Sequence, residues 1–229
     1  MGAVIAVPKA SPPEETQHLV ESWCLPIYYE AAQVLERNGV PSLLGGGLMV
    51  SLYGRARQTK DIDFYVHPRD KNRAMSVLNA SGFHTQETEK PWLLKAEKEG
   101  APVDLIVHSG GMPDLDEECL AHSRTITLGG YLFRGFGPED MLLRKIYSFQ
   151  DGRPDWYDAL SMIQCSAAEI DWGYFLRRVP DNNPARALSF LFFAHAHFQE
   201  ERIPWDVIRQ LGAPYLCLGI PLPHGQLPQ

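Results

Sequence analysis

The sequence has few cysteines, no long apolar run and no recognisable export signal. Its four cysteines include no CxxC pair, so neither a zinc knuckle nor a dense disulfide framework is indicated. No stretch approaches the roughly 18 consecutive apolar residues of a membrane helix. The N-terminal MGAVIAV lacks the basic start and the cleavage site of a signal peptide. We therefore expect a cytoplasmic protein that has no membrane partner.

An excess of positive charge is also missing. The 21 Lys and Arg residues are outnumbered by 28 Asp and Glu residues, which leaves a formal net charge of −7. Binding to long nucleic acids depends on a basic surface, so this balance argues against extensive duplex binding. Internal repeats and low-complexity blocks are absent as well. The 229 residues, 45% of them hydrophobic, are enough for a globular protein with a substantial core.

Secondary-structure signals differ between the two parts of the chain. Before residue 136 we expect strands at 41–44, 61–66, 83–86, 92–96, 103–107, 125–128 and 131–133, and helices at 14–38, 48–53 and 69–80, with Pro26 breaking or kinking the first. After Pro138 we expect only helices, at 139–149, 157–165, 168–178, 184–200 and 205–211. The sequence thus predicts an α+β fold with a first domain over 1–136 and a helical C-terminal region over 137–229. An irregular lead-in of about 12 residues and an extended tail over 221–229 complete the prediction.

Acidic residues stand inside two of the expected strands. Asp61 and Asp63 belong to an apolar run that continues as Phe64-Tyr65-Val66. On a strand, residues i and i+2 face the same side, roughly 7 Å apart. Two carboxylates so placed repel each other and are costly to bury unless a cation lies between them. Asp104, within Val103–Val107, has a similar setting. Three such carboxylates at one sheet edge would form a two-metal site for phosphoryl transfer, suited to Mg²⁺.

Glycine and basic residues around these acids suggest a phosphate site. Gly46-Gly47 lies between an expected strand and an expected helix, where the backbone can approach a phosphate closely. The segment from Arg55 to Arg73 contains six basic and three acidic residues, a local charge of +3. We interpret this segment as a small basic pocket suited to a triphosphate.

A longer pattern carries a family resemblance. After Gly46-Gly47 comes G-x-x-R-x-T-x-D-x-D, which here runs from Gly54 to Asp63 and includes Arg57 and Thr59. A downstream P-E-D…K…R…D-x-x-D run is formed by Pro138-Glu139-Asp140, Lys145, Arg153, Asp155 and Asp158. Over residues 41–165 this combination resembles the nucleotidyltransferases of the DNA polymerase β superfamily. It is most similar to the stand-alone bacterial branch, which includes minimal nucleotidyltransferases and the toxins of type IV abortive-infection toxin–antitoxin pairs.

The resemblance implies a fold, a reaction and a set of site residues. The fold would be a polymerase β-like core, a mixed twisted sheet with flanking helices. The reaction would transfer NMP from an NTP to a hydroxyl acceptor and release pyrophosphate. Asp61, Asp63 and Asp104 would be catalytic and would hold Mg²⁺ (or Mn²⁺), and Asp104 would also help deprotonate the acceptor. The implied nucleotide-binding residues are Gly46, Gly47, Arg57, Thr59, Lys60, Lys145, Asp155 and Asp158.

Several assignments stay open at this point. Asp155 and Asp158 share a helix face, where they could orient Lys145, contact the base or acceptor, or form a structural salt-bridge network. Asp140 is assigned to a helix N-terminus and not to the site. Gly46-Gly47 also departs from the Gly-Ser of many superfamily members, which removes one hydroxyl contact to phosphate.

The acceptor is open as well, and we consider a protein side chain, a tRNA 3′ end and a small molecule. A toxin-like enzyme with a possible cognate antitoxin is the first choice, because the run over 138–158 favours it. The second is an aminoglycoside- or lincosamide-modifying adenylyltransferase. A non-catalytic nucleotide-binding module with the same fold and a metal-dependent hydrolase are the remaining alternatives.

Overall fold

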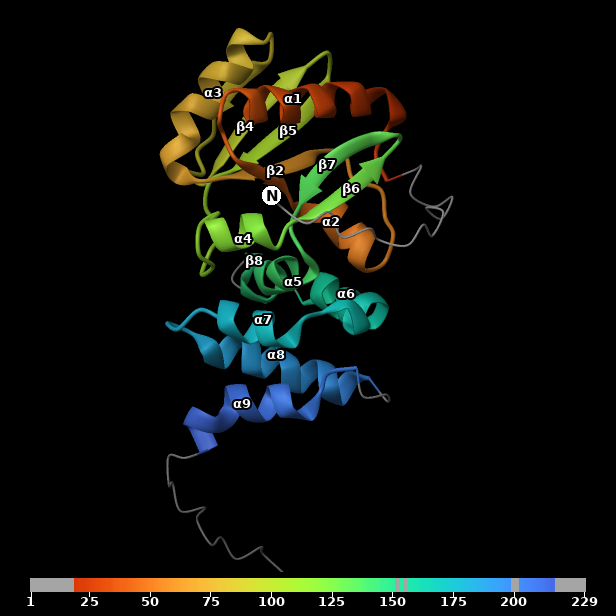
Figure 1. The fold of residues 1–229 in the computed structure, drawn as a ribbon, viewed down its shortest axis with the longest axis vertical. Helices are drawn as coiled ribbons and strands as arrows, with labels where there is room; N and C mark the ends of the chain where they lie inside the picture. Colours follow the sequence, from red (N-terminus) through yellow and green to blue (C-terminus); the bar gives the residue numbers. More distant parts are fainter. Residues whose placement is uncertain (1–18, 151–152, 155, 199–201, 217–229) are drawn as a thin grey trace, which may run out of the picture.

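A seven-stranded sheet dominates the first part of the chain (Figure 1). The computed structural model describes residues 19–150, 153–154, 156–198 and 202–216. The predicted lead-in, the predicted tail and Asp155 therefore lie outside the described residues. The strands are β1 (Ser42–Leu44), β2 (Ile62–Val66), β3 (His84–Glu87), β4 (Leu93–Lys98), β5 (Ala101–Ile106), β6 (Arg124–Leu128) and β7 (Tyr131–Gly135), in the spatial order β3-β4-β5-β2-β1-β7-β6. A short separate pair, β8 (Phe149–Gln150) and β9 (Arg153–Pro154), was not predicted.

Strand β2 lies in the middle of the sheet and sets its mixed character. It pairs antiparallel with β1 and parallel with β5, and β1 in turn pairs parallel with β7. Side chains alternate along β2, so that Ile62, Phe64 and Val66 are buried in the core. Asp63 and Tyr65 consequently point to the opposite face. The predicted mixed sheet within an α+β fold is confirmed.

Helices cover the sheet and continue below it. They are α1 (Leu25–Arg37), α2 (Gly46–Tyr53), α3 (Lys71–Ala80), α4 (Glu117–Ala121), α5 (Pro138–Tyr147), α6 (Tyr157–Ser166), α7 (Trp172–Arg178), α8 (Pro184–His197) and α9 (Trp205–Leu216). Figure 1 shows α1 and α3 at the level of the sheet, against which α1 packs, and α5, α7, α8 and α9 stacked in succession beneath it. Helix α2 contacts β2, α5 and α6, and so connects the sheet to the helical region.

Several predicted boundaries were wrong for identifiable reasons. Pro26 does not break or kink a helix, because it lies in the first turn of α1, where a missing N–H costs no hydrogen bond. Helix α7 begins at Trp172 and not at Ala168, since the Asp171 carboxylate caps it by accepting a hydrogen bond from the Tyr174 amide. Helix α5 ends at Tyr147, two residues early, because the chain then enters β8. The short helix α4 was not predicted at all.

The buried apolar residues form one cluster that extends from the sheet into the helices. Phe64 and Val103 belong to the sheet, and Leu142, Ile163 and Phe190 belong to helices of the C-terminal region, yet all are members of this cluster. The last strand of the sheet ends at Gly135. The predicted boundary near residue 136 therefore coincides with the change from strands to helices. The hydrophobic core is continuous across this boundary, so the division into two domains remains a prediction. Within the described residues, none of the helices combines the length and apolar character of a membrane span.

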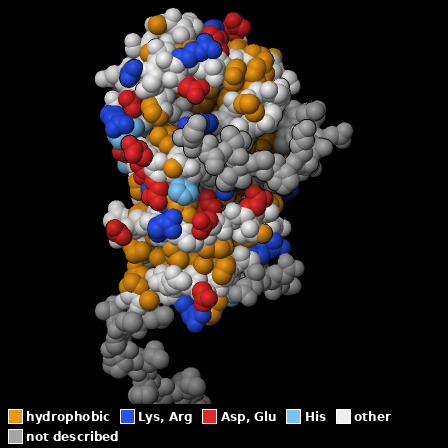
Figure 2. Space-filling view, viewed as in Figure 1, with side chains coloured by type: hydrophobic (Ala, Val, Ile, Leu, Met, Phe, Trp, Pro, Cys, Tyr) orange, Lys and Arg blue, Asp and Glu red, His pale blue; other side chains and the backbone are white. Residues whose placement is uncertain are grey.

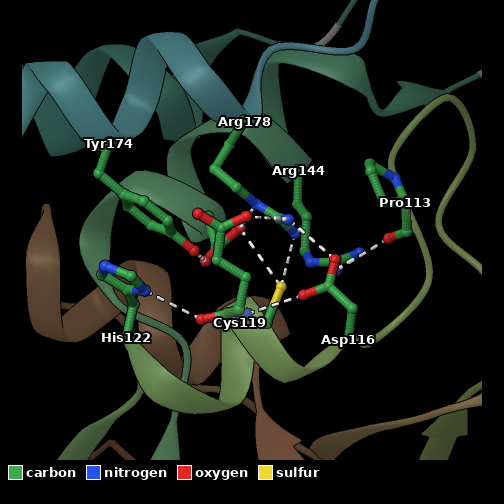
Figure 3. A network of polar contacts seen from close by, with 9 residues as sticks. Pro113, Asp116, Cys119, His122, Arg144, Tyr174 and Arg178 are labelled. Atoms are coloured by element: carbon green, nitrogen blue, oxygen red, sulfur yellow. Dashed lines mark hydrogen bonds and ion pairs between the residues drawn. The ribbon is translucent and has the colours of Figure 1, made fainter.

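A buried polar network joins α4, α5 and α7 (Figure 3). Asp140, which is fully buried in the first turn of α5, accepts hydrogen bonds from Arg178 Nε at 3.2 Å and from the Tyr174 hydroxyl at 2.6 Å. Arg178 also donates to Asp116 Oδ2 at 2.8 Å and to Glu118 Oε2 at 3.2 Å. Asp140 thus lies at the helix N-terminus, as expected, where it connects the helices to one another.

Candidate active site

Two of the three predicted acidic residues lie side by side on the sheet. The parallel register of β2 and β5 sets Asp63 directly opposite Asp104. Asp61 precedes β2 by one residue, two positions before Asp63. Asp104 is buried, with 8% of its surface exposed, and Asp63 is partly buried. The sheet therefore brings these carboxylates together in a place where water screens their charges poorly.

The charges around Asp63 are not balanced. Burial, followed by the neighbouring charges of Asp61 and Asp104, raises the pKa of Asp63 from its ordinary 3.8 to about 6. The charge of Lys145 and a hydrogen bond with the Gly47 backbone lower this pKa, but they do not compensate. The fold thus holds excess negative charge at Asp63.

The Gly46-Gly47 pair packs directly against this carboxylate, where α2 begins. Gly46 has a φ of +59°, and a Cβ atom there would lie 1.7 Å from Asp63 Oδ2. A side chain at this position is therefore excluded both by the backbone conformation and by the contact. The start of a helix also favours negative charge through its dipole and its free amide groups. The pair consequently brings an anion-binding backbone next to the acidic residues.

Asp61 is held by the loop that precedes it. The Thr59 hydroxyl donates a hydrogen bond to Asp61 Oδ1 at 3.0 Å. Thr59 also lies close to Gly47, because a Cβ atom on that glycine would be 3.3 Å from Thr59 Oγ1. Thr59 thus positions a carboxylate beside the start of α2. Lys60, the other predicted residue of this loop, is exposed, and no hydrogen bond or ion pair to the described residues involves it.

Lys145 and Asp158 bring the helical region to the site. Lys145 Nζ in α5 lies 2.8 Å from Asp158 Oδ2 in α6, and Arg57 Nη2 lies 3.4 Å from the same oxygen. Asp158 is thus an ion-pair partner of Lys145, a contact that both the orienting role and the structural salt-bridge role require. This pair also links three segments of the chain, because Arg57 belongs to the loop after α2.

The predicted basic pocket over residues 55–73 does not form. Of its six basic residues, Arg57 is the one that contacts another predicted site residue. Arg55 binds the Tyr157 hydroxyl, and Lys71 pairs with Glu87. Arg69 pairs with Asp70. The chain between Arg57 and Arg73 passes through β2, a 3₁₀ turn and α3, which separates residues that are close in sequence.

Asp104 has a partner that the sequence analysis missed. Lys95 in β4 is directly opposite Asp104 in the antiparallel β4–β5 register, and its Nζ lies 2.9 Å from Asp104 Oδ1. The predicted metal triad is therefore not assembled as such. Within the described ranges, no group of three His, Cys, Asp or Glu side chains is arranged to hold a metal ion.

A cavity of about 830 Å³ opens over the site. Its lining includes Gly46, Gly47, Asp63 and Lys145 from the predicted set. Residues that sequence reasoning missed complete it, namely Trp92 and His108 near the ends of β4 and β5, and Asn182, Asn183 and Arg186 around the start of α8. Nothing local in the sequence marks these residues, since they reach the cavity only through the packing of distant elements.

The carboxylates fit a divalent cation. Asp61, Asp63 and Asp104 supply the hard oxygen donors that Mg²⁺ prefers. Burial and the neighbouring acids raise the pKa of Asp63 despite the charge of Lys145, and a cation near Asp61 and Asp63 would favour the charged carboxylate. Asp104 fits less directly, because Lys95 already neutralises it.

The sheet is mixed, and helix α2 begins with two glycines that pack against a carboxylate of strand β2. A second carboxylate lies on the neighbouring strand β5. Together these features define a nucleotidyltransferase of the polymerase β-like class. The family model described as "uncharacterised nucleotidyltransferase" matches residues 26–199, and the chain belongs to this family. The protein is therefore a nucleotidyltransferase enzyme, whose substrate class is an NTP. A comparison with curated protein sequences gives no match.

A comparison with solved structures gives matches of low sequence identity. The solution structure of the antibiotic-resistance factor ANT(2'')-Ia has 15% sequence identity and a TM-score of 0.47, over 77% of this chain and 98% of that one. Lincomycin-bound lincosamide adenylyltransferase LnuA has 16% identity and a TM-score of 0.44, over 65% and 100%. A nucleotidyltransferase-like antigenic protein of Paracoccidioides brasiliensis has 20% identity and a TM-score of 0.42, over 62% and 75%. These similarities assign no acceptor to this chain.

Proposed function

We propose that this enzyme transfers NMP from an NTP to a hydroxyl group of an acceptor, with Mg²⁺ or Mn²⁺, at the site around Asp63. The observation that carries the proposal is the direct packing of Gly46 and Gly47 against Asp63, beside Asp104 and within the cavity that Lys145 also lines. An anion-binding backbone next to uncompensated carboxylates suits a triphosphate with its cation.

The residues of the chain would share the work as follows. Asp61 and Asp63 would hold one cation, Asp104 would complete the site of a second, and Thr59 would keep Asp61 in place. Gly46 and Gly47 would leave room for the phosphates at the start of α2. A bound divalent cation would neutralise the triphosphate and stabilise charge on the reacting phosphoryl group.

Lys145 would act on the triphosphate and Asp104 on the acceptor hydroxyl. Lys145, oriented by Asp158, would neutralise charge on the triphosphate. A carboxylate oxygen of Asp104 would accept the proton of the acceptor hydroxyl. The oxygen of that hydroxyl would then form a bond to the α-phosphorus as the bond to pyrophosphate breaks.

For the acceptor, our first candidate is a protein side chain or a tRNA end, as in a toxin-like enzyme with a cognate antitoxin. The resemblance over residues 138–158 supports this candidate. Glu139 and Asp140 are buried away from the cavity. The support therefore rests on Lys145 and Asp158, which form an ion pair. The acidic balance of the chain favours contact with a tRNA end over contact with a long duplex. Figure 2 agrees on the face it displays, where acidic and basic side chains are interspersed.

A small-molecule acceptor such as an antibiotic is the second candidate. The cavity of about 830 Å³ is within the size range of small-molecule sites, and Trp92 and Ile106 give it an apolar wall. Such a wall suits an organic acceptor better than a phosphate backbone.

The test is transfer of label from each α-³²P-NTP, with Mg²⁺ or Mn²⁺, to separate pools of protein, tRNA and aminoglycoside or lincosamide drugs. We expect labelled product in one pool and its loss in Asp63→Asn. Asp206→Asn, whose side chain is 69% exposed on α9, is the matched control and should retain transfer.

The outcomes separate the alternatives. Transfer that survives Asp63→Asn would contradict the assigned site. NTP breakdown with no labelled acceptor would favour the metal-dependent hydrolase. No transfer and no breakdown, with NTP binding retained, would favour a non-catalytic nucleotide-binding module.

A further inference from the structure

Asp104 lies between an acidic and a basic neighbour on the sheet. On one side the β2–β5 register sets it opposite Asp63, and on the other the β4–β5 register sets it opposite Lys95. Lys95 Nζ lies 2.9 Å from Oδ1 and 3.4 Å from Oδ2, so the ammonium group engages both oxygens of the carboxylate. This is the position from which a cation would neutralise Asp104.

The two ends of the pair differ in their access to water. The Asp104 side chain is 11% exposed, whereas that of Lys95 is 51% exposed. The carboxylate is thus fixed in the sheet, and the ammonium reaches it on a flexible side chain that can swing into solvent. A competing cation can displace Lys95 without moving either strand.

Within the part of the chain that the structure describes, neither Asp61 nor Asp63 forms an ion pair with a basic side chain. Asp61 accepts from the neutral Thr59 hydroxyl. Lys145, the base whose charge reaches Asp63, is engaged by Asp158 at 2.8 Å. The two parts of the acidic cluster therefore differ among the described residues: Asp61 and Asp63 form no ion pair, while Asp104 forms one with Lys95 of the neighbouring strand.

We infer that Lys95 occupies the place of a second divalent cation at Asp104, so that the resting enzyme takes one divalent ion at Asp61 and Asp63 and admits a second only when Lys95 leaves. This inference rests on the proposed function, since it assumes that the first ion binds at Asp61 and Asp63. It makes Lys95 a positioning residue that sets the affinity of the second ion and holds Asp104 in place until then.

The test counts bound Mn²⁺ on the full chain, with the metal alone, by following free Mn²⁺ with electron paramagnetic resonance. We expect the unsubstituted protein to bind one ion. The affinity for a second ion should be at least tenfold higher in Lys95→Gln than in the unsubstituted protein, because a charge-assisted hydrogen bond no longer competes for Asp104. Lys71→Gln removes a comparable lysine–carboxylate pair, with Glu87, far from the cavity and should bind as the unsubstituted protein does.

Further variants make the inference falsifiable. The Asp104→Asn variant should bind no second ion, and the double variant Asp104→Asn/Lys95→Gln should not bind one either. Identical titrations of Lys95→Gln and the unsubstituted protein would overturn the inference, as would a second ion that survives Asp104→Asn. Single-ion binding that Asp63→Asn abolishes, with no effect of Lys95→Gln, would leave the proposed function intact. Absence of Mn²⁺ binding in every variant would overturn both.

Discussion

Asp140 and Asp63 are two carboxylates that the fold shields from water, and it treats them in opposite ways. Asp140 is fully buried, and a guanidinium, a phenol hydroxyl and a thiol all donate to it. Asp63 is partly buried beside two other acids, and among the described residues the charge of Lys145 and the Gly47 backbone favour its charged form. The first arrangement is typical of a structural polar network, and the network of Asp116, Cys119, Asp140, Tyr174 and Arg178 is called the joint below. The second arrangement is typical of a site that binds a cation.

The difference extends to the surrounding groups. Burial alone would lower the pKa of Arg178, but its hydrogen bond to Asp116 and the charge of Asp140 raise it above the ordinary arginine value. For the Cys119 thiol, burial instead raises the pKa, to about 12, so this cysteine is a neutral hydrogen-bond donor in the joint. Arg178 therefore stays charged and Cys119 stays neutral across the physiological range, whereas the pKa of Asp63, about 6, lies near the edge of that range.

The largest expected effect comes from breaking the joint. Arg178→Met leaves Asp140 buried without its guanidinium, and we expect the free energy of unfolding to fall by about 3–5 kcal/mol. Urea denaturation of the full chain measures it, with Arg209→Met, at a side chain 65% exposed, as the control that should change little. A loss below about 1 kcal/mol would show that the joint does not depend on this pair.

The opposite sign is expected at the site. Asp63→Asn removes a charge that its neighbours oppose, so we expect the metal-free protein to gain about 2–3 kcal/mol of stability at neutral pH, while nucleotidyl transfer is lost. The folded pKa of about 6 exceeds the ordinary 3.8, so the folded state binds more protons between these values. The stability of the unsubstituted protein should therefore fall as pH rises through this window, and Asp63→Asn should lack that slope.

Urea midpoints between pH 4 and 7 measure this slope. Parallel stability curves for the two proteins would mean that Asp63 titrates normally and that its charge is not opposed.

A smaller effect follows from removing one donor of the joint. Tyr174→Phe deletes the hydroxyl that lies 2.6 Å from Asp140 Oδ2 but keeps the ring, which stacks on His122 at a centroid distance of 3.7 Å. We expect a loss of about 1–2 kcal/mol, since Arg178 remains. Thermal unfolding would check it, and an unchanged melting temperature would assign the whole stabilisation to Arg178.

The smallest effect on stability is expected at the outer ion pair of the site. The Arg57 side chain is 50% exposed and lies 3.4 Å from Asp158, which keeps its closer contact with Lys145. Arg57→Gln should change stability by less than about 1 kcal/mol. The KM for NTP should nevertheless rise, because one cation near the triphosphate is removed. A KM equal to that of the unsubstituted enzyme would remove Arg57 from the nucleotide-binding set.

Features that depend on neighbouring residues could be predicted from the sequence. The apolar run over 61–66 predicted a strand, which the structure has as β2, and Gly129-Gly130 predicted the β6–β7 hairpin. Gly46-Gly47 at a strand-to-helix junction indicated the start of α2. Each is a local pattern of turn chemistry or periodicity.

Features that depend on strand register could not. Lys95 stands between the buried residues Leu94 and Ala96 of β4, but its partner follows only from the antiparallel pairing of β4 with β5. The cavity residues Asn182 and Arg186 reach the site through helix packing across more than a hundred residues of chain. The pairing of Asp63 with Asp104 was expected only as convergence at one edge, and the register supplies the rest.

The most direct test of the central claim is the effect of Mn²⁺ on the melting temperatures of the unsubstituted protein and Asp63→Asn. Our account predicts that Asp63→Asn melts higher without metal, and that Mn²⁺ stabilises the unsubstituted protein while leaving the variant unchanged. An Asp63→Asn variant that melts lower without metal, or that gains as much from Mn²⁺ as the unsubstituted protein, would contradict it.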